Sequence, residues 1–345
     1  MLTKIIYGFY RRMLYTRADF KGDVFYFSSD DFEGLNKAAH TVPSSDGHTL
    51  QGYFYYYDNP VKNRLVVFEH GMGSGHRGYM KEIELLCRHG YLVFSYDHTG
   101  CMESGGETTG GFVQSLRDCN DVISNLKKIP ELNGYEISVI GHSWGGFSTL
   151  NICALHPDIR SIVAMSGFVS VEKVLSQFLS GPLSFAFRKI YQLEKEANPV
   201  FIGYNAVDSL KNSDVTALII HSDDDKTVSC DKHFGYMMNK LSEKENITFL
   251  KVSGKNHNPN YTENAVRYLD GVFIDKNITI DGAGHIIDAS EVNRAFKIYG
   301  FNNVTIINTG FNNGQAVEGK SIYSSGTLTI ENNAFTNTAS VKYLD

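Results

Sequence analysis

A serine between glycines stands near the middle of the chain, directly after a short and mostly apolar segment. Residues 137–140 are typical of a buried strand, residues 147–155 are typical of a helix, and a Gly-x-Ser-x-Gly motif occupies residues 141–145. A serine on such a strand-to-helix turn presents its hydroxyl outside the sheet, close to the free N–H groups of the helix start. The pattern predicts that Ser143 is a nucleophile, with an incidental serine in a glycine-rich turn as the alternative.

A serine hydroxyl becomes a useful nucleophile only when a base contacts it and an acid orients that base. In folds with this turn, the partners follow along the chain in the order acid, then histidine. Asp223, Asp224 and Asp225 follow one later apolar segment, and His257 follows the next. The order predicts His257 as the base and leaves the three aspartates as alternatives, of which some can be a solvated acidic turn.

An oxyanion that forms during acyl transfer needs two main-chain N–H donors. The amide of Trp144, directly after the serine, is one candidate. The second donor is expected in the glycine-rich loop after the apolar segment 64–70, where Met72 fits by position.

Metal chemistry is the competing use of the histidines. His70 with His76, or Asp97 with His98, lack the paired spacing found on zinc-binding helices. The five cysteines are dispersed without a Cys-x-x-Cys pair, which argues against a zinc site or a disulfide framework and fits a reducing compartment. The sequence therefore predicts no metal site.

Residues 40–56 are typical of an antiparallel hairpin with a turn at residues 44–48, and from residue 64 to residue 252 apolar segments alternate with helical ones. This alternation is typical of an α/β fold, in which helices cover both faces of a mostly parallel sheet and the site lies beyond the carboxyl ends of the strands. Residues 169–210 interrupt the alternation and are expected to form a helical cap, with ordinary surface helices as the alternative. A closing helix is expected over residues 260–268.

The stretch from about Gly22 to Val272 resembles the α/β-hydrolase superfamily, and within it the serine hydrolases that group with serine aminopeptidase S33-like and Bem46-like proteins. Five motifs carry the resemblance: His70-Gly71-Met72-Gly73, Tyr96-Asp97-His98-Thr99-Gly100 with Glu103-Ser104-Gly105-Gly106, Gly141-His142-Ser143-Trp144-Gly145-Gly146, His221-Ser222-Asp223-Asp224-Asp225-Lys226-Thr227-Val228 and Gly254-Lys255-Asn256-His257. The family's His-Gly-x-x-Asp-x-x-Val motif implies Asp225 as the acid. Two positions depart from the pattern: Ser222 replaces a glycine, and Thr99 replaces an arginine.

The resemblance implies cofactor-free acyl transfer to water. Ser143 would attack the substrate, His257 would move the proton, Asp225 would orient His257, and the amides of Met72 and Trp144 would hold the oxyanion. We expect a carboxylesterase or lipase-like enzyme that cleaves small-molecule carboxylic esters. One alternative is a serine aminopeptidase, in which Glu194 or Glu196 binds the substrate's amine; another is a non-catalytic binding protein.

The two ends of the chain differ from its centre. Residues 1–21 carry basic and aromatic side chains and are expected to form a helix that either packs on the domain or contacts a membrane surface as a peripheral helix. Neither a signal-peptide core nor a membrane span is apparent, so a cytoplasmic location is expected.

The net charge of −6 gives no reason to expect a nucleic-acid partner, and the sequence does not determine the oligomeric state.

Residues 273–345 show a repeat with a spacing of about 25 residues. Segments 277–288, 303–308 and 326–332 each combine β-branched residues with glycine and asparagine. The segment resembles adhesin-like and pectate-lyase-like repeat proteins, which implies a short parallel β-helix. We interpret it as a structural appendage, with a surface-binding module as the alternative, and expect activity to survive its removal. The expected domains are therefore 1–21, 22–272 and 273–345.

Overall fold

The computed structural model describes residues 2–20, 26–58, 60 and 63–260, and, further along the chain, seven short segments: 272–274, 277–288, 295–298, 303–312, 321–324, 326–336 and 341–343. The chain divides into two compact units, one of residues 1–19 and 27–260 and one of residues 20–26 and 261–345. The division after Asn260 precedes the expected boundary at Val272. The expected closing helix over 260–268 lies outside the described residues beyond Asn260.

The first unit is built on one eight-stranded sheet with the order β1-β2-β4-β3-β5-β6-β7-β8. Its antiparallel part is the edge hairpin of β1 and β2, and β2 also pairs antiparallel with β4. All other pairs are parallel. The expected α/β architecture is thus confirmed. The strands are β1 (Asn36–Pro43), β2 (Thr49–Tyr56), β3 (Arg64–Glu69), β4 (Leu92–Tyr96), β5 (Glu136–His142), β6 (Ser161–Met165), β7 (Thr216–Ser222) and β8 (Ile247–Val252).

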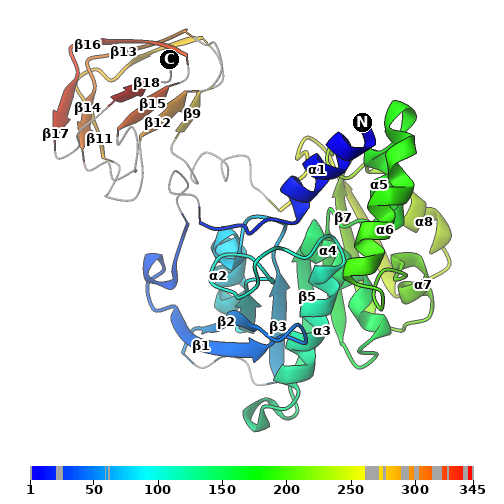
Figure 1. The fold of residues 1–345 in the computed structure, drawn as a ribbon. Helices are drawn as coiled ribbons and strands as arrows, with labels where there is room; N and C mark the ends of the chain where they lie inside the picture. The colour runs from blue at the N-terminus through cyan, green and yellow to red at the C-terminus, as the bar shows by residue number, and fades with distance from the viewer. Residues whose placement is uncertain are drawn as a thin grey trace. The chain divides into compact units, whose positions relative to one another are not determined.

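The sheet is buried on both faces because successive strand residues point to opposite sides. In β3, Leu65 and Val67 belong to a large core on one face, while Val66 and Phe68 belong to a smaller core on the other. Helices cover both faces (Figure 1). The larger core is covered by α3 (Gln114–Leu126), α4 (Trp144–Asn151), α7 (Ala206–Lys211) and α8 (Tyr236–Lys240), and the smaller by α2 (Met80–Arg88).

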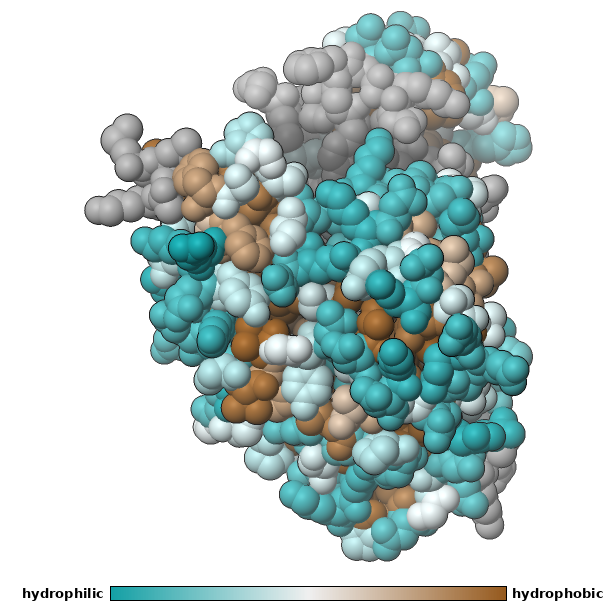
Figure 2. Space-filling view, turned by 90° about the vertical axis from the view of Figure 1, so that its right-hand side faces the viewer, coloured by the Kyte–Doolittle hydropathy of each residue, from teal (hydrophilic) through white to brown (hydrophobic). Residues whose placement is uncertain are grey.

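Residues 169–210 form helices between β6 and β7, where a cap is expected. They comprise α5 (Val171–Phe178), the 3₁₀ segment η5 (Gly181–Ala186), α6 (Phe187–Ala197) and α7. Gly181 separates α5 from α6 with a φ of 57°, which a residue with a side chain adopts only under strain. On this side of the molecule the surface is largely hydrophilic, with separate hydrophobic patches (Figure 2).

The N-terminal helix α1 (Leu2–Leu14) is part of the first unit. Its Tyr10 and Leu14 belong to the larger core, and the helix lies against η5 and α6. Among the described residues, no helix combines the length and apolar character that crossing a membrane requires.

The second unit contains three parallel sheets, ordered β10-β13-β16, β11-β14-β17 and β18-β15-β12-β9. Consecutive strands β10, β11 and β12 belong to different sheets, and each pairs with the strand one repeat later: Ile280 pairs with Ile306, which pairs with Ile330. Ile298, Ile306 and Phe311 are buried in a small core. The strands are β9 (Val272–Ile274), β10 (Ile278–Asp281), β11 (Ile286–Asp288), β12 (Phe296–Ile298), β13 (Asn303–Ile307), β14 (Gly310–Asn312), β15 (Ile322–Ser324), β16 (Thr327–Glu331), β17 (Ala334–Thr336) and β18 (Val341–Tyr343). The resemblance to β-helix repeat proteins remains a prediction.

Candidate active site

Ser143 occupies a strained turn between β5 and α4. Its φ of 55° and ψ of −109° place a residue with a side chain in a conformation that glycine normally adopts. The flanking glycines are required sterically. A Cβ on Gly141 would come within 2.3 Å of the carbonyl oxygen of Gly145, and a Cβ on Gly145 within 2.3 Å of that of Glu69. The turn therefore fits only a small-residue motif of this kind, as the sequence predicts.

The structure brings Ser143, His257 and Asp225 into one hydrogen-bonded chain. Nε2 of His257 lies 2.7 Å from Oγ of Ser143, and its Nδ1 lies 2.8 Å from Oδ2 of Asp225. The imidazole is 17% exposed, whereas the carboxylate is fully buried. This is the geometry that a base needs in order to accept the serine proton while an acid holds its ring.

Of the three adjacent aspartates, only Asp225 contacts His257. Its second oxygen, Oδ1, accepts hydrogen bonds from the main-chain N–H groups of Thr227 and Val228. Asp223 instead accepts from Ser253, and Asp224 accepts from the amide of Asn256.

The environment of Asp225 keeps its carboxylate ionised. Burial alone would raise the pKa of Asp225, but hydrogen bonds from His221 and His257 outweigh it and hold that pKa well below its usual range. Nε2 of His221 lies 3.1 Å from Oδ2, on a ring that is itself fully buried. A permanently charged acid is suited to stabilising an imidazolium.

Two main-chain amides are free near the serine. Within the described part of the chain, neither the N–H of Met72 nor that of Trp144 donates a hydrogen bond. Trp144 begins α4, where unpaired N–H groups are expected. The loop that contains Met72 lies beside the serine turn, because a Cβ on Gly71 would come within 3.5 Å of the carbonyl oxygen of His142. Both predicted oxyanion donors thus belong to loops that meet at the serine turn.

Two contacts hold the side chain of Trp144, the residue that follows Ser143. Its Nε1 donates to the carbonyl of Phe112 at 2.7 Å, and its ring centroid lies 4.8 Å from that of His98. His98 is fully buried between two carboxylates, with Nε2 3.5 Å from Glu69 and Nδ1 3.3 Å from Asp118. This buried polar cluster packs against the ring of Trp144 and supports its position.

The histidines considered as metal ligands have other partners. His76 bonds Asp97 through its Nδ1 and its main-chain N–H, both at 2.8 Å. His70 contacts the carbonyl of Gly71 through Nδ1, and its Nε2 accepts from the amide of His98. Among the residues that the structure describes, no three His, Cys, Asp or Glu side chains are grouped so as to hold a metal ion.

Two residues that sequence reasoning did not assign to the site also meet there. Tyr79 bonds the main chain of Gly71 and the ring of His142, and His142 contacts the carbonyl of His257. No motif marks Tyr79. His142 lies inside the serine motif, but nothing in that motif indicates a contact with the loop that carries His257.

The sheet, its helices and the serine turn form the α/β-hydrolase fold. Residues 60–200 match the family described as "Serine aminopeptidase, S33". A curated relative, the uncharacterized protein YqkD of Bacillus subtilis (strain 168), is 30% identical over 128 residues, which are 37% of this chain. The match spans about two fifths (41%) of that relative's own length.

Solved structures show the same fold at low identity. The esterase Pf2001 of Pyrococcus furiosus superposes with a TM-score of 0.54 and 19% identity, covering 70% of this chain and 90% of that chain. An acylaminoacyl peptidase of Pyrococcus horikoshii gives a TM-score of 0.52 and 16% identity, covering 69% of this chain and 39% of that chain. These comparisons show the fold, and the activity and substrate class have to be argued from the chain's own residues.

Proposed function

We propose that this protein is a cofactor-free serine hydrolase that cleaves small-molecule carboxylic esters, with Ser143 as nucleophile, His257 as base and Asp225 as orienting acid. The observation that carries the proposal is the chain of contacts from Asp225 to His257 at 2.8 Å and from His257 to Ser143 at 2.7 Å. Each member comes from a different loop at the carboxyl end of a strand, where α/β sheets build their sites.

The reaction would proceed through an acyl-enzyme. Oγ of Ser143 attacks the ester carbonyl carbon while Nε2 of His257 accepts the hydroxyl proton, and the carbonyl oxygen becomes an oxyanion facing the amides of Met72 and Trp144. Collapse of this intermediate breaks the bond to the leaving alkoxide, which takes the proton from His257. Water then repeats the sequence on the acyl-serine, and Asp225 stays ionised throughout.

One contact favours an ester over an aminopeptidase substrate. An aminopeptidase needs an acid to bind the free amine, and Glu194 is the buried candidate in the cap. Both of its oxygens are already used: Oε1 accepts from Tyr10 and Tyr15, and Oε2 accepts from the amide of Phe112. Glu194 is fully buried and has no side open to a substrate. The aminopeptidase alternative is left with Glu196, an exposed residue of α6.

The proposal is tested by hydrolysis of p-nitrophenyl esters of graded acyl length beside amino-acid arylamides. We expect ester hydrolysis that falls by about 10³-fold or more in Ser143→Ala, because the nucleophile is lost. Ser180→Ala, at an exposed serine between α5 and α6, serves as the matched control and should leave the rate unchanged. Faster cleavage of arylamides than of esters would favour the aminopeptidase, and no cleavage of either substrate would favour a binding protein.

A further inference from the structure

A buried tyrosine and a buried histidine connect the two loops on which the proposed reaction depends. The hydroxyl of Tyr79 lies 3.0 Å from the main-chain N of Gly71 and 2.7 Å from Nδ1 of His142. Nε2 of His142 lies 2.7 Å from the main-chain carbonyl oxygen of His257. The contacts therefore run from the loop after β3, through Tyr79 directly before α2 and through the serine turn, to the loop that carries His257.

The direction of every hydrogen bond in this chain is fixed by its ends. A carbonyl oxygen only accepts, so Nε2 of His142 carries the proton and donates to His257. Nδ1 of the same neutral ring then accepts from the hydroxyl of Tyr79, whose oxygen in turn accepts from the N–H of Gly71. Every donor of these contacts faces an acceptor. If the imidazole of His142 were protonated, its Nδ1–H would face the Tyr79 hydroxyl, and that hydroxyl would lose its acceptor.

The surroundings of the chain enforce this single arrangement. Both side chains are only 4% exposed, so water does not compete for the bonds. Burial first, and the nearby His257 second, lower the pKa of His142 to about 4, which keeps the ring neutral. A Cβ on Gly71 would lie 2.7 Å from the hydroxyl of Tyr79 and 3.2 Å from Nδ1 of His142, so a side chain there would push the contacts apart.

We propose that Tyr79 and His142 are positioning residues that lock the Gly71–Met72 main chain and the His257 loop into one rigid geometry. The inference rests on the proposed function. The bond to the N–H of Gly71 fixes that residue's main chain and so orients the next amide, that of Met72. The bond to the carbonyl of His257 fixes that residue's main chain and so the distance of its ring from Ser143. A displacement of about 1 Å between such groups lowers a catalysed rate by about 10²-fold.

The test compares two replacements of His142. In His142→Gln, the side-chain amide can still donate to His257 and accept from Tyr79; in His142→Leu, both contacts are lost with little change of volume. On the ester that the wild type cleaves best, we expect kcat to fall about 30- to 100-fold in His142→Leu with KM changed less than about 3-fold, and most of kcat to return in His142→Gln. Tyr79→Phe, which removes one oxygen, should resemble His142→Leu.

The outcomes separate this inference from the proposed function. If the wild type does not hydrolyse esters, the proposed function fails; if it does, the variants decide the positioning role. Wild-type kcat in both Tyr79→Phe and His142→Leu would overturn that role, as would a loss in His142→Gln as large as that in His142→Leu. Thermal unfolding is measured alongside, and if His142→Leu does not fold, Tyr79→Phe alone decides, because it keeps the buried ring.

A separate observation concerns the outer face of α1. Ile5, Phe9 and Met13 recur every four residues, so they lie on one face of the helix, and they are 58%, 67% and 54% exposed. The neighbouring face, with Tyr10 and Leu14, packs into the core. The apolar sector of α1 is thus wider than the part that packs on the first unit.

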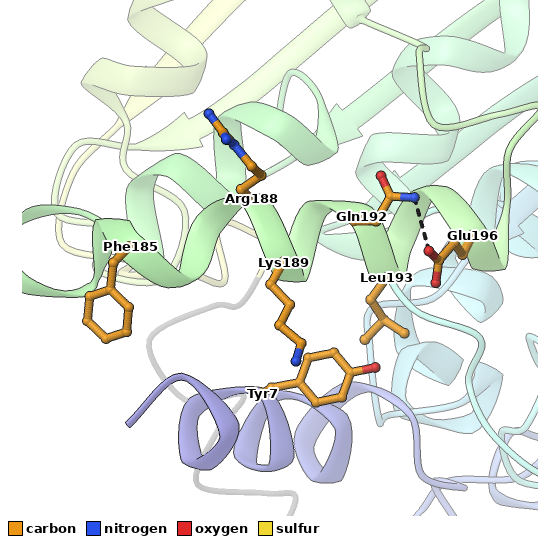
Figure 3. Close-up of a pocket in the computed structure, with 7 residues that line it drawn as sticks. All are labelled: Tyr7, Phe185, Arg188, Lys189, Gln192, Leu193 and Glu196. Atoms are coloured by element: carbon orange, nitrogen blue, oxygen red, sulfur yellow. Dashed lines mark hydrogen bonds between the residues drawn. The ribbon is translucent and has the colours of Figure 1, made fainter. Parts of the chain in front are cut away.

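Cations lie on α1 itself and on α6, which packs against the other side of α1. A groove of about 540 Å³ runs between α1 and α6, and Figure 3 shows Lys189 and Leu193 projecting from α6 toward α1, with the Lys189 side chain reaching the ring of Tyr7, while Phe185 of η5 projects to the same side. The ammonium of Lys189 lies 4.7 Å above the Tyr7 ring. α1 contains Lys4, Arg11 and Arg12 and no acidic residue, and Arg12, three residues after Phe9, lies beside the apolar stripe and is exposed. Positive charge gathered beside exposed apolar groups, in a chain of net charge −6, is complementary to an anionic lipid surface.

We infer that this face of α1 docks on the surface of an anionic lipid bilayer. Apolar side chains would enter the interface while arginine and lysine meet the headgroups. The test sediments the full chain with vesicles of phosphatidylcholine alone or with about one quarter phosphatidylglycerol. We expect binding to the anionic vesicles, weakened about 10-fold or more in Phe9→Ser/Met13→Ser.

The matched control is Leu85→Ser/Met238→Ser, which changes two apolar residues of α2 and α8 with 51% and 46% exposure. It should bind the vesicles as the wild type does. The inference is overturned if the wild type does not sediment with anionic vesicles, or if Phe9→Ser/Met13→Ser binds them equally well. It is also overturned if the wild type forms a dimer that Phe9→Ser/Met13→Ser dissociates, because a second copy would then cover the face.

Discussion

The hydroxyl of Tyr10 donates a 2.6 Å hydrogen bond to Oε1 of Glu194, which joins the first helix of the chain to the cap helix α6 inside the protein. Tyr15 donates to the same oxygen at 3.0 Å, and the amide of Phe112 donates to Oε2 at 2.9 Å. The carbonyl of Phe112 in turn accepts from the ring of Trp144. The N-terminal helix is therefore connected through Glu194 and Phe112 to Trp144, the residue that follows Ser143.

Removing both hydroxyls with Tyr10→Phe/Tyr15→Phe should destabilise the first unit. Burial raises the pKa of Glu194 and the tyrosine hydrogen bonds lower it, with burial the larger effect. Without those bonds the buried carboxylate keeps one donor, and we expect the free energy of unfolding at pH 7 to fall by about 3 kcal/mol. Urea unfolding measures the change.

The same variant should show a distinct pH dependence. A carboxyl group whose folded pKa is raised contributes stability at low pH, and that contribution is lost as pH rises through the folded pKa. Losing the tyrosine donors raises this pKa further, so the deficit should shrink as the pH is lowered and Glu194 becomes protonated. Tyr7→Phe, on the same helix, should cost less than about 0.5 kcal/mol. An equal loss in Tyr7→Phe would contradict the role of the buried bonds.

Asp225→Asn should lower kcat by about 10³- to 10⁴-fold with little change in KM. An amide in place of the carboxylate cannot stabilise an imidazolium and favours the wrong tautomer of His257. Asp223→Asn, which changes a neighbouring carboxylate bonded to Ser253, should stay within about 3-fold of the wild type. Steady-state kinetics on the preferred ester measures both, and equal losses in the two variants would show that charge in the loop, rather than contact with His257, matters.

The buried histidine His233 should make the protein less stable in mild acid. Burial is the main cause that lowers the pKa of His233 to about 3 from the ordinary 6.5. A depressed folded pKa means that stability is complete above the unfolded pKa and is lost as pH falls toward the folded one, because only the unfolded chain takes up the proton. Between pH 7 and pH 5 the loss from this one ring is about 2 kcal/mol.

His233→Asn removes this titration while keeping polar atoms near Val169 and Gln177. Its free energy of unfolding should therefore depend less on pH, by about 2 kcal/mol between pH 7 and pH 5. Above pH 7.5 the difference between variant and wild type should be constant, which serves as the internal control. A difference that does not change with pH would show that His233 is not held neutral.

The second unit should be dispensable for hydrolysis. Phe311 is 2% exposed and stacks on Phe335 at a centroid distance of 5.1 Å, so Phe311→Ala should destabilise that unit by about 3 kcal/mol. We expect faster proteolysis within residues 261–345 and an unchanged kcat/KM on the ester. Phe335→Ala, at a 38% exposed position, should have the smaller effect on proteolysis. Loss of ester hydrolysis in soluble Phe311→Ala would contradict this division of roles.

The sequence alone determined the local features of this protein. Alternating apolar segments predict the buried strands and covering helices, and Gly141 and Gly145 around Ser143 predict a turn that only glycines fit. These features can be predicted from the sequence because the periodicity of strands and helices, and the space available in a tight turn, depend on residues close together in the chain.

Tertiary structure decided which distant residues meet. The residues around His257 leave three aspartates open until a family motif implies Asp225, and the fold then places only Asp225 in contact. Nothing local shows that Glu194 bonds Tyr10, 184 positions away, or that His142 reaches the carbonyl of His257, 115 positions away. Such bonds depend on how the sheet and its loops pack, because a hydrogen bond forms only where the fold brings a donor and an acceptor within about 3 Å in the right direction.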